Sequence, residues 1–366
     1  YTTPLVVGAS GADGQPITVT GGVDSGHNGK VILDGRMRQP SGVVLESAQH
    51  VVVRGLVLRD FLEEAVRIHD SRDVLAEGST IHAPARGFHI LRSSDVTIRG
   101  NTVTSPSFVD LQTDGIYSQD NSRNRYERNT IVISNAETEG HDDGIQSYRD
   151  TDIAVVGNYV EQRNPKTYNA QGIFMVDARG TMLAVNNIVY APNTRNGLLT
   201  LLNQSGTGGV LLAYNNTLVG SQWGVIQIQD VPGARIFNNI LYTTAPNGAG
   251  ITVTGALPPP GNIDHNLYFT PNGAPAYLVG GDHQRWQDWR ARGYEPNGVE
   301  GEPRFVDLAA RKFTLSAASP AIDAGKVLDL GHAAPAATRA GPPGDRPDLG
   351  AYGPVGAPTA GRAATR

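Results

Sequence analysis

The sequence predicts an all-β protein, a parallel β-helix (solenoid) of roughly nine to ten coils with a C-terminal covering segment. Three observations predict this fold: a strand-like motif returns at a nearly constant spacing, an asparagine returns at a similar spacing, and no helical periodicity separates them. Glycine is abundant, at 44 of 366 residues, and cysteine is absent. The lack of cysteine excludes disulfide scaffolds, zinc–cysteine sites and thiol chemistry.

The repeating motif is a small residue followed by an apolar residue, any residue and a second apolar residue. A spacing of about 20 to 30 residues with strand-like content indicates a solenoid, and a second β-rich segment after most motifs leaves no room for a long helix. Leucine-rich repeats are the main alternative, but their regular leucine frame is missing. The motif begins at Gly42, Ala65, Gly87, Gly115, Gly144, Gly172, Gly197, Gly224 and Gly250.

One asparagine recurs once per coil, at Asn101, Asn129, Asn158, Asn187 and Asn216. We expect the side-chain amides to stack inside a bend of the solenoid at the ~4.8 Å spacing of neighbouring strands. This ladder is structural, and we assign no chemistry to it.

Charge and hydropathy exclude several classes of partner. The formal net charge of −5 argues against a general nucleic-acid or membrane-surface role, because both partners favour a basic face. No apolar run approaches the ~18 residues of a membrane span, and no flavin, nicotinamide or phosphate motif stands out. We therefore expect no nucleic acid, no membrane and no organic cofactor. Whether the chain is a monomer or a homo-oligomer stays open.

Six segments near the two ends of the chain carry a family resemblance: 16–21, 29–35, 303–307, 313–315, 319–325 and 348–352. They resemble right-handed parallel β-helix proteins that act on polysaccharides, in particular uronate lyases of the chondroitinase B and alginate lyase type. The resemblance implies right-handed coils, a secreted or periplasmic location, and an acidic polysaccharide or oligosaccharide as partner. Lyases, epimerases and hydrolases share this fold, so the fold does not choose the reaction. The Lys and Arg motifs of family six alginate lyases and the Asp-Pro-His signature of mannuronan epimerases are absent, so neither mechanism is carried over.

We expect three parts: a β-helix over 1–270, a C-terminal segment over 271–333 that packs on it, and an extended Ala/Pro/Gly-rich tail over 334–366. Tyr1 to Ser10 reads as a strand entered midway, so the chain is expected to begin inside the first coil. Counted from the small residue of the motif, four apolar side chains of the later coils fall at outward positions. Another part of the protein must then shield them from water. We expect the segment after residue 270, with its aromatic residues, to provide this cover, and oligomerisation is the rival explanation. The four side chains are Leu199, Leu201, Ile226 and Ile228, and the aromatic residues are Trp286, Trp289, Tyr294 and Phe305.

The outward positions of the early coils concentrate titratable side chains. Because side chains alternate between the two faces of a strand, stacking the coils turns each outward position into a column. One column is expected to run through Arg67, His89, Tyr117 and Gln146. Such concentrations are where active sites are sought. The remaining members of this candidate site are His69, Arg86, Asp114, His141, Asp143, Tyr148 and Arg149.

The first chemical hypothesis is β-elimination on a uronic-acid polysaccharide. It needs a cation for the carboxylate, which Arg67 or Arg86 would supply through a planar guanidinium. His89 suits the base, and Tyr117 suits the acid or both roles, with neighbouring guanidinium groups favouring its phenolate. The expected substrate-binding residues are Arg86, His69, Gln146, Tyr148, His141 and Arg149, although Arg149 also reads as half of an ordinary ion pair with Asp120.

Alternatives remain open. Asp114 and Asp143, on adjacent coils, would serve as the carboxylate pair of a glycoside hydrolase of polygalacturonase type. C5 epimerisation uses the same parts as elimination, and a non-catalytic carbohydrate-binding solenoid is a third possibility. Calcium is conceivable at Glu137, Glu139, Asp142 and Asp143, but a solvated acidic loop is the favoured interpretation and no cofactor is expected.

Overall fold

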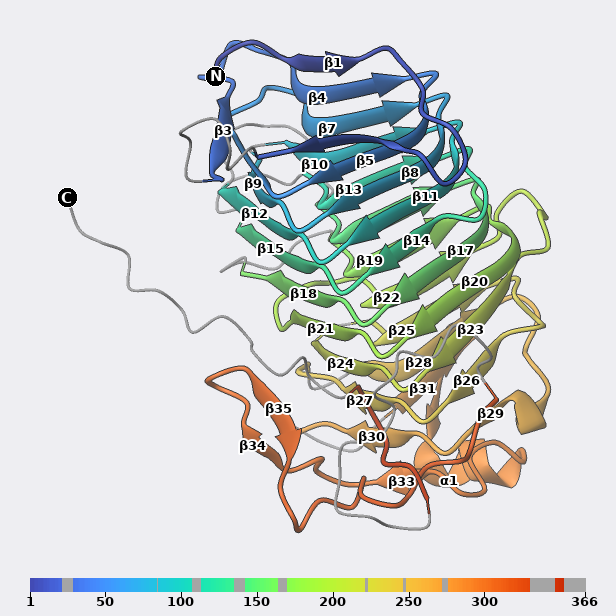
Figure 1. Cartoon of the computed structure of the whole chain (residues 1–366). Coiled ribbons are helices and arrows are strands. Elements are labelled where there is room, and N and C mark those ends of the chain that lie inside the picture. Colours follow the sequence, from blue (N-terminus) through green and yellow to red (C-terminus); the bar gives the residue numbers. More distant parts are fainter. Residues whose placement is uncertain are drawn as a thin grey trace.

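The computed structural model describes residues 1–21, 29–83, 85–106, 113–134, 142–163, 170–220, 223–245, 248–271, 276–329 and 346–351. Within them the chain winds into a parallel β-helix whose coils each take one strand from each of three long sheets, as the stacked arrows of Figure 1 show. Every strand of a coil pairs in parallel with its counterpart in the next coil, and only β32 pairs antiparallel within these three sheets. The predicted all-β solenoid is therefore confirmed.

The first sheet carries the candidate site on its outer face. Its 12 strands are, in order, β1 (Leu5–Val7), β4 (Ser41–Glu46), β7 (Glu64–His69), β10 (Arg86–Leu91), β13 (Ile116–Gln119), β16 (Ile145–Tyr148), β19 (Ile173–Val176), β22 (Leu199–Leu202), β25 (Ile226–Gln229), β28 (Ala249–Thr254), β31 (Ala276–Val279) and β32 (Asp282–Arg285).

The other two sheets complete each coil. The second sheet contains β2 (Ile17–Thr20), β5 (Gln49–Arg54), β8 (Arg72–Glu77), β11 (Ser94–Arg99), β14 (Arg125–Glu127), β17 (Thr151–Val156), β20 (Arg179–Val185), β23 (Val210–Tyr214), β26 (Arg235–Phe237) and β29 (Ile263–Asp264). The third contains β3 (Val31–Asp34), β6 (Leu56–Arg59), β9 (Thr80–His82), β12 (Thr102–Pro106), β15 (Thr130–Ser134), β18 (Tyr159–Gln162), β21 (Ile188–Ala191), β24 (Thr217–Gly220), β27 (Ile240–Tyr242), β30 (Leu267–Phe269) and β33 (Val299–Glu300).

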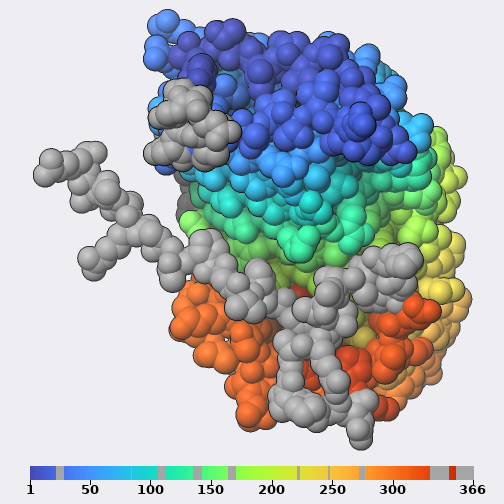
Figure 2. Space-filling model, viewed as in Figure 1, coloured from blue at the N-terminus to red at the C-terminus, as the bar shows by residue number. Residues whose placement is uncertain are grey.

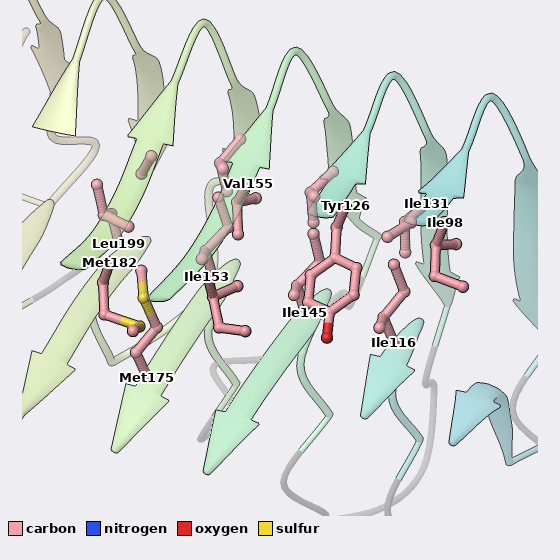
Figure 3. Packing of buried hydrophobic residues seen from close by; sticks show 14 of the residues in the cluster. Ile98, Ile116, Tyr126, Ile131, Ile145, Ile153, Val155, Met175, Met182 and Leu199 are labelled. Atoms are coloured by element: carbon pink, nitrogen blue, oxygen red, sulfur yellow. The ribbon is translucent and has the colours of Figure 1, made fainter. Parts of the chain in front are cut away.

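The small residue of the repeat is required by the packing inside the coil. A Cβ added at Gly115 would lie 2.4 Å from the Ile131 side chain, and one at Gly144 would lie 2.3 Å from Val160. The next two positions of each motif alternate as predicted, because Ile116 is fully buried and Tyr117 is half-exposed. Figure 3 shows side chains from the three walls, Ile116 among them, meeting in one apolar interior.

The predicted asparagine ladder is confirmed and is longer than expected. Each side-chain amide donates to the Oδ1 of the next asparagine at 2.9 to 3.1 Å. Asn239 and Asn266 continue the ladder beyond Asn216, and Glu295 ends it by accepting the Asn266 amide at 2.7 Å. Every amide donor inside this bend is thereby satisfied by a neighbouring coil.

The expectation that four later apolar side chains face outward is wrong. Leu199, Leu201, Ile226 and Ile228 are fully buried in the core. The register pairs Ile173 with Leu199, so the later strands are shifted by one residue relative to the motif glycines. These side chains need no cover.

The C-terminal segment does pack on the β-helix, but elsewhere. The helix α1 (Trp286–Ala291) lies at the end of the coil stack, where Trp289 stacks between Tyr277 and Tyr294 with ring centroids 4.9 and 3.9 Å apart. The strands β34 (Phe305–Asp307) and β35 (Lys312–Leu315) form a hairpin, drawn in orange in Figures 1 and 2. Phe313 of this hairpin packs against the third sheet.

The coil stack extends past the predicted boundary at residue 270, because β31 and β33 still pair with it. Of the predicted tail, residues 346–351 are described, and Leu349 packs against Ile240 and Leu267 of the third sheet. No helix among the described residues has the length and apolar content to cross a membrane.

Candidate active site

Four consecutive strands of the first sheet form one outward column of polar side chains. The register pairs Arg67 of β7 with His89 of β10, His89 with Tyr117 of β13, and Tyr117 with Gln146 of β16. All four side chains are half-exposed, whereas their neighbours Ile116 and Ile145 are fully buried. The predicted outward ladder is therefore confirmed.

Three rings of this surface touch across neighbouring coils. The centroids of His69 and His89 lie 4.6 Å apart, and those of His89 and Tyr117 lie 5.2 Å apart, both edge to face. The Arg86 guanidinium lies over the Tyr117 ring at 4.8 Å from its centroid. Two imidazoles, a phenol and a guanidinium therefore meet within one patch.

Glu64 is the hub of the patch, and sequence reasoning missed it. Its carboxylate accepts from the Ser41 hydroxyl at 2.5 Å and from Arg67 Nε at 2.6 Å, and His89 Nδ1 lies 3.5 Å from its Oε2. Burial opposes ionisation, but hydrogen bonds from His89 and Ser41 and the charge of Arg67 outweigh it and lower the pKa of Glu64 to about 2. The one signal in the sequence was its outward position in the same column as Arg86.

The two candidate guanidinium groups differ in what holds them. Arg67 is bound by two carboxylates, because its Nη2 lies 2.9 Å from Glu63 and its Nε bonds Glu64. Arg86 is 3.8 Å from Asp114, and its Nε has no hydrogen-bond partner among the described residues. That nitrogen is itself buried, but the side chain is partly exposed, and its ion pair is longer than the two that hold Arg67.

The pKa of Tyr117 contradicts the expected phenolate. Burial raises this pKa above its usual 10.0, and the opposing charge of Arg86 does not cancel the increase. The hydroxyl donates to Gln119 Oε1 at 2.8 Å, so it carries its proton in the neutral pH range. Tyr117 is a proton donor in this structure.

His69 is a neutral neighbour rather than a cation. Burial first, and then the nearby charges of His89 and Arg67, lower the pKa of His69 to about 4. Its Nε2 is buried and has no hydrogen-bond partner among the described residues. It packs on the edge of His89 and completes the ring stack.

Asp114 and Asp143 are buried and serve the backbone of the next coil. Their side chains are at most 1% exposed. Asp114 Oδ1 accepts the Asp143 N–H at 3.1 Å, and Asp143 Oδ1 accepts the Gln171 N–H at 2.7 Å. This geometry favours a role in coil stacking over contact with a sugar.

The remaining predicted residues lie along the same face. Tyr148 is half-exposed beside Gln146, and the Arg149 guanidinium lies 4.5 Å from its ring centroid. Arg149 forms a bidentate ion pair with Asp120 at 2.6 and 2.7 Å, as the ordinary ion-pair interpretation predicts. His141 lies outside the described residues.

The described residues do not support the calcium hypothesis. Glu137 and Glu139 lie outside them. Asp142 Oδ1 accepts the Thr113 N–H at 2.9 Å, which engages it in coil stacking like Asp143. In the part of the chain that the structure describes, no three acidic or histidine side chains are grouped so that they could hold a metal ion.

Comparisons with known proteins agree with the fold. Residues 41–217 match the family model described as "Right handed beta helix region". A search of curated proteins finds no match.

Similar solved structures include an alginate lyase from Paenibacillus sp. str. FPU-7, with 13% identity over 80% of this chain and 87% of that chain, at a TM-score of 0.35. PfbA, a surface adhesin of Streptococcus pneumoniae, shows 10% identity over 72% of this chain and 74% of that chain, at a TM-score of 0.34. An endo-xylogalacturonan hydrolase from Aspergillus tubingensis shows 11% identity over 74% of this chain and 79% of that chain, at a TM-score of 0.30. Scores this low carry no argument about activity.

Proposed function

We propose that this right-handed parallel β-helix protein is a polysaccharide lyase that cleaves an acidic, uronic-acid-containing polysaccharide by β-elimination on the outer face of β7, β10, β13 and β16. The observation that carries the proposal is the contact of His89 with Tyr117 on neighbouring coils, with the Arg86 guanidinium over the Tyr117 ring. The resemblance of both chain ends to uronate lyases supports the substrate class. Since such polymers lie outside the cytoplasm, we also propose that the protein is exported.

Elimination needs three groups around one sugar. A base removes the proton at C5, next to the carboxylate, and the electrons of that C–H bond form a double bond between C4 and C5. The C4–O bond to the leaving sugar breaks, and an acid protonates the leaving oxygen. A cation that binds the carboxylate stabilises the charge that develops beside C5.

His89 fits the base. Its Nδ1 faces the ionised Glu64 at 3.5 Å, which favours the tautomer with the proton on Nδ1 and leaves the Nε2 lone pair to accept the C5 proton. Glu64 itself is a positioning residue, because it is only 2% exposed and acts through His89 and Arg67.

Tyr117 fits the acid. Its raised pKa keeps the phenol protonated, and its position one strand from His89 puts donor and base on the same face. Arg86, on the same strand as His89, fits the cation, because its side chain is partly exposed and its ion pair with Asp114 is long, at 3.8 Å. These roles place base, acid and cation on two adjacent strands.

A screen of uronate polymers tests the proposal, with ultraviolet absorbance of the unsaturated product and product mass read together. An absorbing product without added water supports elimination, and the Tyr117→Phe variant should abolish it. Products heavier by one water and lacking the absorbance would make the protein a hydrolase. An uncleaved polymer with altered sugar stereochemistry would make it an epimerase.

A further inference from the structure

Trp223 is the exposed member of the three tryptophans of the chain. Its side chain is 59% exposed, whereas Trp289 is fully buried and Trp286 packs against Tyr268 and Tyr277. Singly exposed apolar side chains are normal on protein surfaces, so the surroundings of this ring decide whether it marks a binding site. The candidate active site makes no use of this ring, which stands just before β25.

The main chain under this ring is fixed from both sides. The Trp223 N–H donates to the Arg195 carbonyl on the preceding coil at 3.1 Å, and its own carbonyl accepts from the Thr252 hydroxyl at 2.7 Å on the following coil. The next residue must be glycine, because a Cβ at Gly224 would lie 2.3 Å from Thr252 Oγ1. The ring therefore projects from a rigid platform rather than from a loop held at one end.

The sheet face beside Trp223 differs in chemistry from the candidate active site. Past Gln146 the column of His89 and Tyr117 continues as Phe174, Thr200, Gln227 and Thr252, none of them charged; Gln227 is partly exposed and the other three are buried. An amide group on the same sheet face as an exposed aromatic ring suits a sugar, which has hydroxyls at its edge and C–H groups on its face.

A cation accompanies the ring. Arg195 is exposed, and it forms no ion pair with any residue that the structure describes. Its carbonyl bonds the Trp223 N–H, so the two residues are neighbours across the coil boundary. An exposed arginine at the neighbouring position of the adjacent coil, together with an exposed aromatic ring, suits a carboxylated sugar.

We propose that Trp223 and Arg195 form a distal subsite for the same acidic polysaccharide, with the indole stacked on a sugar ring and the guanidinium bound to a uronate carboxylate. The inference rests on the proposed function and adds a preference for long chains. β25 is four strands beyond β13 in the sheet, roughly 19 Å along the helix axis at the spacing of paired strands. A substrate must extend over several sugar units to reach both sites.

Such a subsite raises affinity for polymers without touching the reacting atoms. The test compares wild type, Trp223→Ala and Trp223→Phe on uronate oligosaccharides of increasing length. We expect Trp223→Ala to raise KM roughly two- to tenfold for long chains only, with kcat and the KM of short chains unchanged. Trp223→Phe should recover part of the loss. Tyr1→Ala removes an equally exposed aromatic side chain at the other end of the chain and should have no effect.

Binding without turnover separates this inference from the proposed function. In the Tyr117→Phe variant, long uronate chains should quench the emission of Trp223, and Arg195→Gln should weaken the quenching. If uronate chains quench the emission but wild type does not cleave them, the subsite is supported and the lyase assignment is refuted. If the KM for long chains is unchanged in Trp223→Ala, the subsite is refuted but the lyase assignment is not. Equal quenching by neutral polysaccharides, or no quenching at all, would also overturn it.

Discussion

His89 Nδ1 lies 3.5 Å from Glu64 Oε2, so a half-exposed imidazole on one strand rests against a buried carboxylate on the strand before it. Since Arg67 and Ser41 hold the same carboxylate, the imidazole cannot turn its Nδ1 away without losing its contact with an ionised carboxylate. The pair fixes which nitrogen of His89 reaches the substrate, and it gives the candidate base a defined direction.

Glu64 should make the protein acid-sensitive in a specific pH range. Its carboxyl has a pKa of about 2 when folded and 4.5 as a reference, so the stability it contributes is present above about 4.5 and is lost as the pH falls through 2. The shift corresponds to a contribution on the order of 3 kcal/mol. Urea unfolding of Glu64→Gln should therefore show a smaller loss of stability between these pH values than wild type.

The matched control for this prediction is Glu63→Gln, which removes the exposed partner of Arg67. Its acid profile should follow wild type. An acid profile of Glu64→Gln identical to that of wild type would mean that the carboxylate is not held as the contacts indicate.

Glu295 should have the opposite effect to Glu64 on how the free energy of unfolding depends on pH. Burial is the main cause that raises the pKa of this carboxyl to about 8, at the end of the asparagine ladder. Between pH 4.5 and 8 the folded state then holds a proton that the unfolded state has released, so the free energy of unfolding falls as the pH rises. Glu295→Gln should flatten this dependence in urea titrations, and the exposed control Glu300→Gln should not. A steep profile that persists in Glu295→Gln would assign the effect to another group.

The outward face of β7 to β16 was predictable because the motif glycines of these coils share one structural cause. At Gly87, Gly115 and Gly144 the missing Cβ leaves room for an interior side chain of the third sheet. At Gly197 and Gly224 it leaves room for Thr200 and Thr252 on the outer face instead. The sequence motif is the same, so the one-residue shift of the later strands could not be seen from the pattern.

The site was predictable in its membership but not in its electrostatics. Columns of outward residues follow from strand periodicity, and they brought Arg67, His89 and Tyr117 together. Glu64 stood in a neighbouring column. Nothing in the sequence indicated that its side chain would be buried in contact with Arg67 and His89. Burial also decides the direction of the pKa shift at Tyr117, where the sequence showed only the nearby guanidinium groups.

Arg86→Lys and Arg67→Lys should separate the two guanidinium groups. Lysine keeps the charge but loses the planar fork that binds a carboxylate through two hydrogen bonds. Because Arg67 is already held by Glu63 and Glu64, its substitution should mainly reduce stability, while Arg86→Lys should raise KM and lower kcat on uronate polymers. Steady-state kinetics and thermal unfolding of both variants check this. A larger kinetic defect in Arg67→Lys would reverse the assignment.

Tyr117→Phe should separate elimination from hydrolysis. The substitution keeps the ring beside His89 and under Arg86 and removes only the phenolic hydroxyl, with its hydrogen bond to Gln119, so folding should change little. If Tyr117 is the acid, kcat falls by a factor on the order of 10² to 10⁴. Asp114→Asn should be milder in catalysis, because that buried carboxyl supports the backbone of the next coil, and its effect should appear in thermal stability. An inactive Asp114→Asn beside a fully active Tyr117→Phe would make the carboxylate the catalyst and the lyase assignment wrong.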